Sequence, residues 1–201
     1  VRINMAVKNK TLGQEQVLLD ALNYAKENKK NIHLLGLVSN GGIHSHIDHL
    51  KGLLDVAAEN KAENVYLHAF TDGRDCDPKS GKFFINDVQE HMKKTTGELA
   101  SITGRYFAMD RDKRWERVKI SYDALVNAVG VKSTNAIESI EKSYADNVTD
   151  EFIKPVIMTN ADGTPKAQIK AGDVGSQAVY PRASKVARNP PLGKEEASGS
   201  C

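Results

Sequence analysis

The feature that most constrains the fold is an alternation of strand-sized apolar runs with amphipathic helical segments. The run Ile32 to Val38 (IHLLGLV) is almost continuously apolar and ends at Ser39-Asn40-Gly41-Gly42, a pattern typical of a strand buried on both faces. A helix is predicted from about His46 to Asn60, and a second strand from Asn64 to Phe70. Such a β-α-β unit has parallel strands.

The alternation continues along the chain. Helices are predicted at Gln14 to Asn28, near Ile85 to Thr95 and at Lys113 to Val129, with a strand at Leu99 to Thr103. Ile153 to Asp173 reads as a short strand, an Asp-Gly turn and a second strand that leads out of the domain. We therefore predict an α/β fold with a parallel-type sheet and flanking helices.

Size and composition restrict the class of protein. The 201 residues suffice for one domain, and 28 basic against 26 acidic residues give a net charge of +2, too little to attract nucleic acid or a membrane surface. The absence of an apolar run of ~20 residues or a signal pattern argues against a membrane protein. With only two cysteines and no C-x-x-C spacing, we expect a reducing cytoplasm.

The two ends of the sequence look different from the middle. The chain begins at Val1 without an initiator Met, which indicates a fragment of a longer protein. Residues 174–201 lack sustained periodicity and gather proline and glycine. We expect a domain at residues 1–173, followed by an irregular tail at 174–201 that is foreign to it.

Polar residues gather after each of three successive predicted strands. Because ligands in open α/β sheets bind at the carboxyl ends of the strands, Ser39 to His46, Thr71 to Asp77 and Gly104 to Arg111 are expected to form one site. In the first loop, glycines allow close backbone approach, and the start of the following helix favours an anion. His44 is the candidate functional residue of this loop.

The first loop has alternative interpretations. His44 and His46 form an H-x-H pair, which also occurs in metal-dependent hydrolases, but carboxylate ligands would be needed beside it. We prefer to place His46 and His49 on a solvated helix face. For His44 we prefer a binding function.

The second loop, Thr71-Asp72-Gly73-Arg74-Asp75, surrounds a guanidinium with carboxylates. Arg74 can bind a carboxylate or phosphate with two parallel hydrogen bonds. Alone, the motif is better explained as an Asp-Gly turn with an internal ion pair. Its position beside the other loops favours binding by Arg74 and Asp75.

The third loop places several cationic side chains between Gly104 and Trp115. Arg105 follows the strand directly and Arg111 precedes the next helix, so both are predicted to point over one small anion. Arg114 and Arg117 are assigned to the helix surface. Interspersed acidic residues argue against a groove for single-stranded nucleic acid.

Taken in order, the motifs SNGGIHSH, HAFTDGRD and GRYFAMDRDKRW resemble those of the bacterial-type cofactor-independent phosphoglycerate mutases. The resemblance covers roughly Leu12 to Asp173 and implies the three-layer substrate domain of that family. It implies an isomerase of glycolysis that interconverts 3-phosphoglycerate and 2-phosphoglycerate. The whole enzyme is expected to be a cytoplasmic monomer with a phosphorylated serine and two manganese ions.

By the same resemblance, the substrate-binding residues are His44, Arg74, Asp75, Arg105 and Arg111. The serine nucleophile and the metal ligands of the family belong to parts that this chain lacks, so we expect no metal site and no turnover from the chain alone. Its substrate-binding residues match the family motifs, but two departures stand out. Asn40 replaces the usual Asp, and no arginine-rich motif follows Asp173.

Two other functions remain open on the sequence. One is a stand-alone module that binds small phosphorylated carboxylates without changing them. The other is a metal hydrolase built on His44, His46 and nearby acidic residues.

Overall fold

A computed structural model describes residues 2–177 of the chain, which form a single six-stranded sheet with helices on both faces. The strands lie in the order β4-β5-β3-β2-β1-β6. No helix within residues 2–177 combines the length and the apolar character that crossing a membrane requires.

The strands are β1 Ile32–Leu37, β2 Val65–Thr71, β3 Glu98–Gly104, β4 Val131–Ser133, β5 Val156–Met158 and β6 Val174–Gln177. The helices are α1 Arg2–Lys8, η1 Leu12–Gln14, α2 Gln16–Glu27, α3 Ile47–Glu59, α4 Gly81–Lys94, α5 Arg105–Ala108, α6 Trp115–Asn127, α7 Ala136–Ala145 and η2 Asp150–Phe152, where η marks a 3-10 helix.

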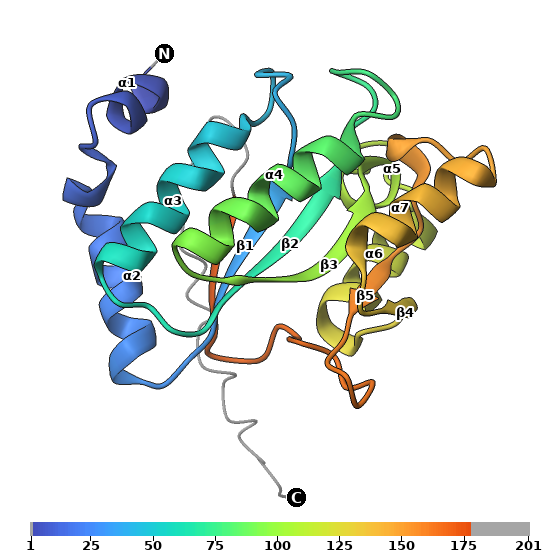
Figure 1. Cartoon of the computed structure of the whole chain (residues 1–201). Helices are drawn as coiled ribbons and strands as arrows, with labels where there is room; N and C mark the ends of the chain where they lie inside the picture. Colours follow the sequence, from blue (N-terminus) through green and yellow to red (C-terminus); the bar gives the residue numbers. More distant parts are fainter. Residues whose placement is uncertain (1, 178–201) are drawn as a thin grey trace, which may run out of the picture.

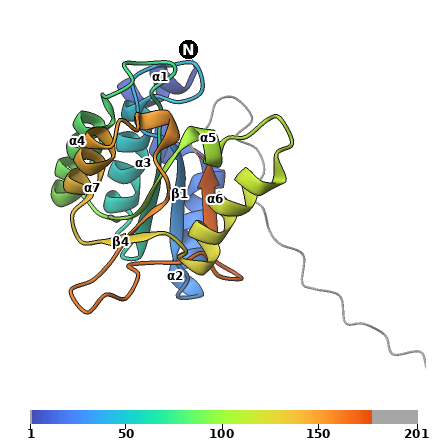
Figure 2. The ribbon, with the colours of Figure 1, turned by 90° about the vertical axis from the view of Figure 1, so that its right-hand side faces the viewer.

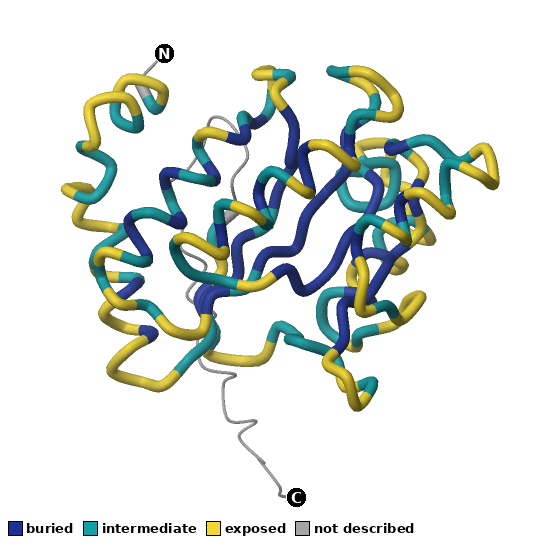
Figure 3. Tube along the Cα trace, in the orientation of Figure 1, coloured by how far each residue is buried: buried dark blue, intermediate teal, exposed yellow. Residues whose placement is uncertain are grey.

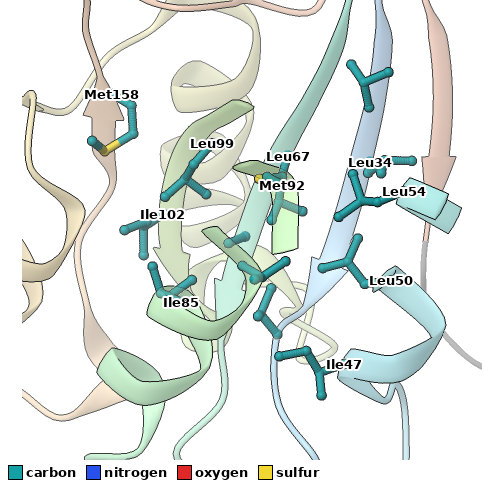
Figure 4. Close-up of a cluster of buried hydrophobic side chains, with 14 of the residues drawn as sticks. Leu34, Ile47, Leu50, Leu54, Leu67, Ile85, Met92, Leu99, Ile102 and Met158 are labelled. Carbon is teal, nitrogen blue, oxygen red and sulfur yellow. The ribbon is translucent and has the colours of Figure 1, made fainter. Parts of the chain in front are cut away.

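The molecule has three layers, as the two views at right angles show (Figures 1 and 2). Helices α3, α4 and α7 cover one face of the sheet, and α6 lies on the other. The central strands are buried along almost their whole length (Figure 3). Side chains such as Leu34, Leu54, Leu67 and Ile85 fill the space between the sheet and α3 and α4 (Figure 4). The predicted α/β class and its flanking helices are confirmed.

Most predicted elements match the observed ones within a few residues. Among the predicted helices α4 differs most, because it begins at Gly81 rather than near Ile85. Its first turn is fixed by the buried carboxylate of Asp150, which accepts a hydrogen bond from the Gly81 amide at 2.7 Å. This contact spans 69 residues of sequence, so local periodicity could not reveal it.

The parallel arrangement holds for β1, β2, β3 and β6, but β5 runs antiparallel to β3. The chain reaches η2 at the carboxyl end of β3, where the Gly104 amide donates to the carbonyl of Ile153 at 2.7 Å. The strand that follows must therefore run back along β3. The prediction of a second strand before Asp173 is wrong. Between β5 and β6 the described chain forms no strand, and a single β-bridge joins Thr159 to Pro165.

The expectation of an irregular segment from residue 174 is wrong for its first four residues. Val174–Gln177 forms β6, which pairs in parallel with β1 from Ile32 to Leu35. The preceding residue helps to set this register, since the Asp173 carboxylate accepts a hydrogen bond from the Asn31 amide at 3.1 Å. The rest of the predicted tail, residues 178–201, lies outside the described residues.

A buried polar chain crosses the central strands. His33 Nδ1 lies 2.9 Å from His68 Nε2, and His68 Nδ1 lies 2.8 Å from the hydroxyl of Ser101. At the other end, His33 Nε2 lies 3.2 Å from Asp173 Oδ2. Burial, and then the neighbouring His33, lowers the pKa of His68 to about 3. Burial also lowers the pKa of His33, although Asp173 opposes that shift.

Glycines at the strand ends make room for η2. A side chain at Gly104 would place its Cβ 2.4 Å from the carbonyl oxygen of Glu151 and 2.7 Å from the amide nitrogen of Ile153. At Gly73 the φ of +67° suits glycine, and a Cβ would lie 2.9 Å from that of Asp150. The η2 segment thus sits directly against the backbone that carries two of the predicted binding loops.

The buried histidines predict a loss of stability in acid. The pKa of His68 is about 3 in the folded chain and ordinarily 6.5, so the unfolded chain binds more protons between these values and stability falls as pH decreases below 6.5. From pH 7.5 to pH 5, His68 alone is expected to remove about 2 kcal/mol of unfolding free energy, measured by urea denaturation. His68→Gln should show a shallower pH dependence; an unchanged slope would contradict the assignment.

The contact at Gly104 predicts a specific packing defect. Gly104→Ala should lower the unfolding free energy by about 1–3 kcal/mol. The added methyl group would clash with backbone atoms of η2, which cannot move away as a flexible side chain could. Gly175→Ala is the matched control, since no atom of residues 2–177 lies within 4 Å of its Cβ position. Thermal denaturation of both variants checks the prediction, and equal melting temperatures would refute it.

Candidate functional site

The three predicted loops meet at the carboxyl edge of the sheet, where β1, β2 and β3 end. In Figure 1 the loops that follow β1 and β2 stand side by side at the top of the molecule. Gly41 of the first loop packs on Asp75 of the second so closely that a Cβ would lie 2.8 Å from the Asp75 Cβ and 3.0 Å from its carbonyl oxygen. A glycine is therefore required for the two loops to come this close.

The carboxylate of Asp72 joins all three loops. Its Oδ2 accepts a hydrogen bond from the Ser39 hydroxyl at 2.6 Å, and its Oδ1 accepts from Arg105 Nη1 at 2.7 Å. The amides of Arg74 and Asp75 also donate to Oδ1, at 3.2 and 3.0 Å. Burial alone would raise the pKa of Asp72, but these donors outweigh it and hold the pKa below its ordinary value. Asp72 is therefore a buried, ionised carboxylate at neutral pH, and its hydrogen bonds hold the three loops together.

Arg105 lies between two carboxylates rather than in open solvent. Its Nη1 donates to Asp72 and to Asp75 Oδ2, both at 2.7 Å, and its side chain is only 10 % exposed. Burial alone would lower the pKa of Arg105, but the hydrogen bonds to the two carboxylates raise it above its ordinary value. Nε and Nη2 of Arg105 make no hydrogen bond to any other described residue, so part of its donor fork stays available to a ligand.

His44 joins this group from the first loop. Its Nε2 lies 3.9 Å from Asp75 Oδ2, the same oxygen that Arg105 binds. The start of α3 is less open than predicted, because His46 caps it by accepting a hydrogen bond from the Asp48 amide at 3.2 Å. The Ile47 amide likewise bonds to the carbonyl of Ser39. The amides of Ile47 and Asp48 are therefore not free to bind an anion, as the sequence had suggested for this helix start.

The side chain of Arg74 pairs with a residue outside its own turn. It is 56 % exposed, and its Nη1 lies 3.6 Å from Glu151 Oε1 of η2. The ion pair inside the turn that the sequence suggested as an alternative is not formed by Arg74. Asp72 and Asp75 instead pair with Arg105, which enters from the third loop.

Arg111 and Arg117 differ in their surroundings. Arg111 is exposed and forms no hydrogen bond or ion pair with another described residue. Arg117, assigned from sequence to the helix surface, instead contacts Asp110, Asp112 and the ring of Tyr106. The placement of Arg114 on the surface is confirmed, because its side chain is 59 % exposed.

An open hollow of about 380 Å³ lies next to these groups. It is lined by Asn40, Gly41, Asp75, Cys76, Asp77, Ser80 and Phe84. Nearby, the hydroxyl of Ser45 is buried and has no hydrogen-bond partner among the described residues. No cluster of three or more His, Cys, Asp or Glu side chains in residues 2–177 could hold a metal ion.

Two residues that organise the site, Asp72 and Glu151, were not predicted from the sequence. Asp72 was visible within the TDGRD motif, where an Asp two residues before an exposed Arg suggests a turn carboxylate that bonds backbone amides. No sequence pattern indicated that Glu151 pairs with Arg74, because the two residues lie 77 positions apart. The described geometry brings His44, Asp75 and Arg105 together directly. Arg74 shares the turn of Asp75 but pairs with Glu151, and Arg111 is exposed on the segment between α5 and α6.

Comparison with known proteins identifies the family. Residues 3–177 match the family described as BPG-independent PGAM N-terminus (iPGM_N). The chain is similar to the 2,3-bisphosphoglycerate-independent phosphoglycerate mutase of Flavobacterium johnsoniae, with 58% identity over 173 residues, which cover 86% of this chain and 34% of the relative. The enzyme of the same name from Bacteroides fragilis is 51% identical over 174 residues, covering 87% and 34%.

A solved structure supports the same relationship. The chain is similar to a structure described as "Crystal structures of Leishmania mexicana phosphoglycerate mutase at low cobalt concentration", with a TM-score of 0.82, 26% identity and coverage of 88% of this chain and 34% of that one. The chain thus spans about a third of the length of these relatives. The resemblance inferred from the three loops is confirmed, and because the family match extends from residue 3 to the end of β6, this chain belongs to the family of BPG-independent phosphoglycerate mutase N-terminal regions.

Proposed function

We propose that this chain is the substrate-binding domain of a 2,3-bisphosphoglycerate-independent phosphoglycerate mutase, and that it binds 3-phosphoglycerate and 2-phosphoglycerate. The observation that carries the proposal is the convergence of His44, Asp75 and Arg105 from three loops at one sheet edge. Family membership supports the choice of ligand, since the relatives are named for this activity.

The chemistry of the ligand suits the groups on these loops. A phosphoglycerate carries a phosphate and a carboxylate, whose oxygens are acceptors for the exposed guanidinium groups of Arg74 and Arg111. Arg105 adds its unoccupied donors next to Asp75. His44 and Asp75 share the remaining side of the site, where the imidazole and the carboxylate can hydrogen-bond the glycerate hydroxyls and hold a proton there.

The remaining steps of the reaction are assigned to the rest of a longer protein. We propose that this remainder supplies the serine that is phosphorylated and the ligands of two manganese ions, and that the whole enzyme is a cytoplasmic monomer of glycolysis. Bound manganese would stabilise negative charge on the phosphoryl group. Since no described residues of this chain form a fitting ligand set, no step is assigned to a metal held here.

Neither alternative function has a specific observation in its favour. The hydrolase hypothesis needs His44 and His46 to act as ligands, yet Nδ1 of His46 is already occupied by the Asp48 amide. A stand-alone binding module would use the same residues as the proposed domain. It differs only in the absence of a catalytic partner.

Binding is expected to depend on the two exposed arginines. In titration calorimetry with 3-phosphoglycerate, Arg74→Ala and Arg111→Ala should each weaken binding by about 10- to 100-fold, the value of one charge-assisted hydrogen bond. Both side chains are exposed, so melting temperatures should stay close to that of the unmodified chain.

Arg114→Ala is the matched control for these variants. Its side chain is exposed to a similar degree, and among the described residues it pairs with Glu116 alone, at 3.4 Å. It should leave affinity unchanged apart from a small effect of net charge. If all three variants bind equally well, or if the unmodified chain does not bind 3-phosphoglycerate at millimolar concentration, the proposed ligand is wrong.

The chain alone is expected not to interconvert the two phosphoglycerates. Ser39 donates its hydroxyl hydrogen bond to Asp72 and is buried, and Ser45 is buried as well, so neither presents an accessible nucleophile. Phosphorus NMR of 3-phosphoglycerate incubated with the chain and manganese should show no 2-phosphoglycerate. If product forms, Ser39→Ala and Ser45→Ala will identify the hydroxyl responsible.

A further inference from the structure

We propose that Arg117 is a positioning residue that fixes the loop carrying Arg111, residues 109–114, and keeps the Arg111 guanidinium free for the ligand. The inference rests on the proposed function for its ligand, but its structural basis is separate. The loop leaves α5 and returns to α6, and Figure 2 shows it on the opposite side of the sheet from α4 and α7.

The surroundings of Arg117 distinguish it from an ordinary surface arginine. Its side chain is 18 % exposed, and its Cζ lies 3.9 Å from the ring centroid of Tyr106. A planar guanidinium at this distance stacks on the aromatic face and gains a cation-π attraction. Tyr106 follows Arg105 directly, so this contact ties the start of α6 to the third loop of the site.

The same guanidinium binds the acidic residues on both sides of Arg111. Nη1 of Arg117 lies 3.3 Å from Asp110 Oδ1 and 3.7 Å from Asp112 Oδ2. In an Asp-Arg-Asp sequence, the nearest partners for the central arginine are its own neighbours. Because Arg117 attracts both carboxylates, Arg111 is left without an ion pair among the described residues.

Asp110 holds the loop through its second oxygen. Its side chain is only 1 % exposed, and Oδ2 accepts a hydrogen bond from the Arg114 amide at 2.9 Å. One carboxylate therefore bonds the backbone at the start of α6 and the side chain of Arg117. Both ends of the short segment that contains Arg111 are fixed by this group.

The contacts extend to the other exposed arginine of the site. The ring of Tyr106 lies 5.1 Å from that of Phe152, centroid to centroid. Phe152 belongs to η2 next to Glu151, which pairs with Arg74 at 3.6 Å. Arg117, Tyr106 and η2 thus form one chain of contacts that connects the start of α6 with Arg74.

The test measures 3-phosphoglycerate binding to the 201-residue chain by calorimetry in a double-mutant cycle. Arg117→Ala should weaken binding at least 10-fold, while Arg114→Ala, three residues earlier, should not. In an Arg111→Ala background, Arg117→Ala should cause no further loss, because its effect passes through Arg111. Arg117→Lys, which keeps the charge but not the planar stack, should recover affinity only in part.

A second measurement examines the loop without any ligand. Hydrogen exchange of the Met109 and Arg114 amides, which bond to Arg105 and Asp110, should accelerate at least 10-fold in Arg117→Ala. Exchange in β1, β2 and β3 should be unchanged, which separates a local effect from general unfolding.

The outcomes separate this inference from the proposed function. If Arg111→Ala weakens binding but Arg117→Ala does not, or if the two losses simply add, the positioning role is overturned while the proposed ligand stands. Unchanged exchange at Met109 and Arg114 also overturns it. If Arg111→Ala has no effect although exchange accelerates in Arg117→Ala, Arg117 holds the loop but the assigned ligand contact of Arg111 is wrong.

Discussion

The ionised carboxylate of Asp72 is the constraint on which the candidate site depends. A buried charge is costly unless donors surround it, and here the donors come from three separate strand ends: Ser39, the turn amides and Arg105. Each donor therefore fixes the loop to which it belongs. Since Arg105 also binds Asp75, the carboxylate that faces His44 is oriented by the same network. Removal of one partner would leave the others with an uncompensated buried charge.

The division between buried and exposed arginines follows from this constraint. Arg105 is largely occupied by neutralising carboxylates, so its first function is to assemble the loops, and only its remaining donors can serve a ligand. Arg74 and Arg111 are exposed and carry the charge that an anionic ligand would meet first. Arg74 pairs with Glu151, and the segment that carries Arg111 is held by the hydrogen bond between Asp110 and the Arg114 amide.

Much of the fold was predictable from the sequence because β1, β2, α3 and α6 follow local hydrophobic periodicity. Elements fixed by distant contacts were not predictable in this way. The reversal of β5 depends on where η2 meets Gly104, and β6 depends on pairing with β1, supported by Asp173. Proline and glycine after residue 177 concealed a four-residue strand whose partner lies more than a hundred positions away. Short strands of this kind obtain their stability from the sheet rather than from their own residues.

The site shows the same separation between local and distant information. Strand-end position predicted that the loops of His44, Asp75 and Arg105 are neighbours, and these three side chains do meet, because parallel strands bring their carboxyl ends to one edge. Binding by Arg74 and Arg111 at the same site stays a prediction. Charge patterns could not decide which arginine pairs with which acid. In the Asp-Arg-Asp segment, sequence proximity favours pairing within the segment, yet the described geometry gives both carboxylates to Arg117. An arginine in the first turn of α6 thus pairs with the two acidic neighbours of a loop arginine, and only the three-dimensional arrangement reveals this pairing.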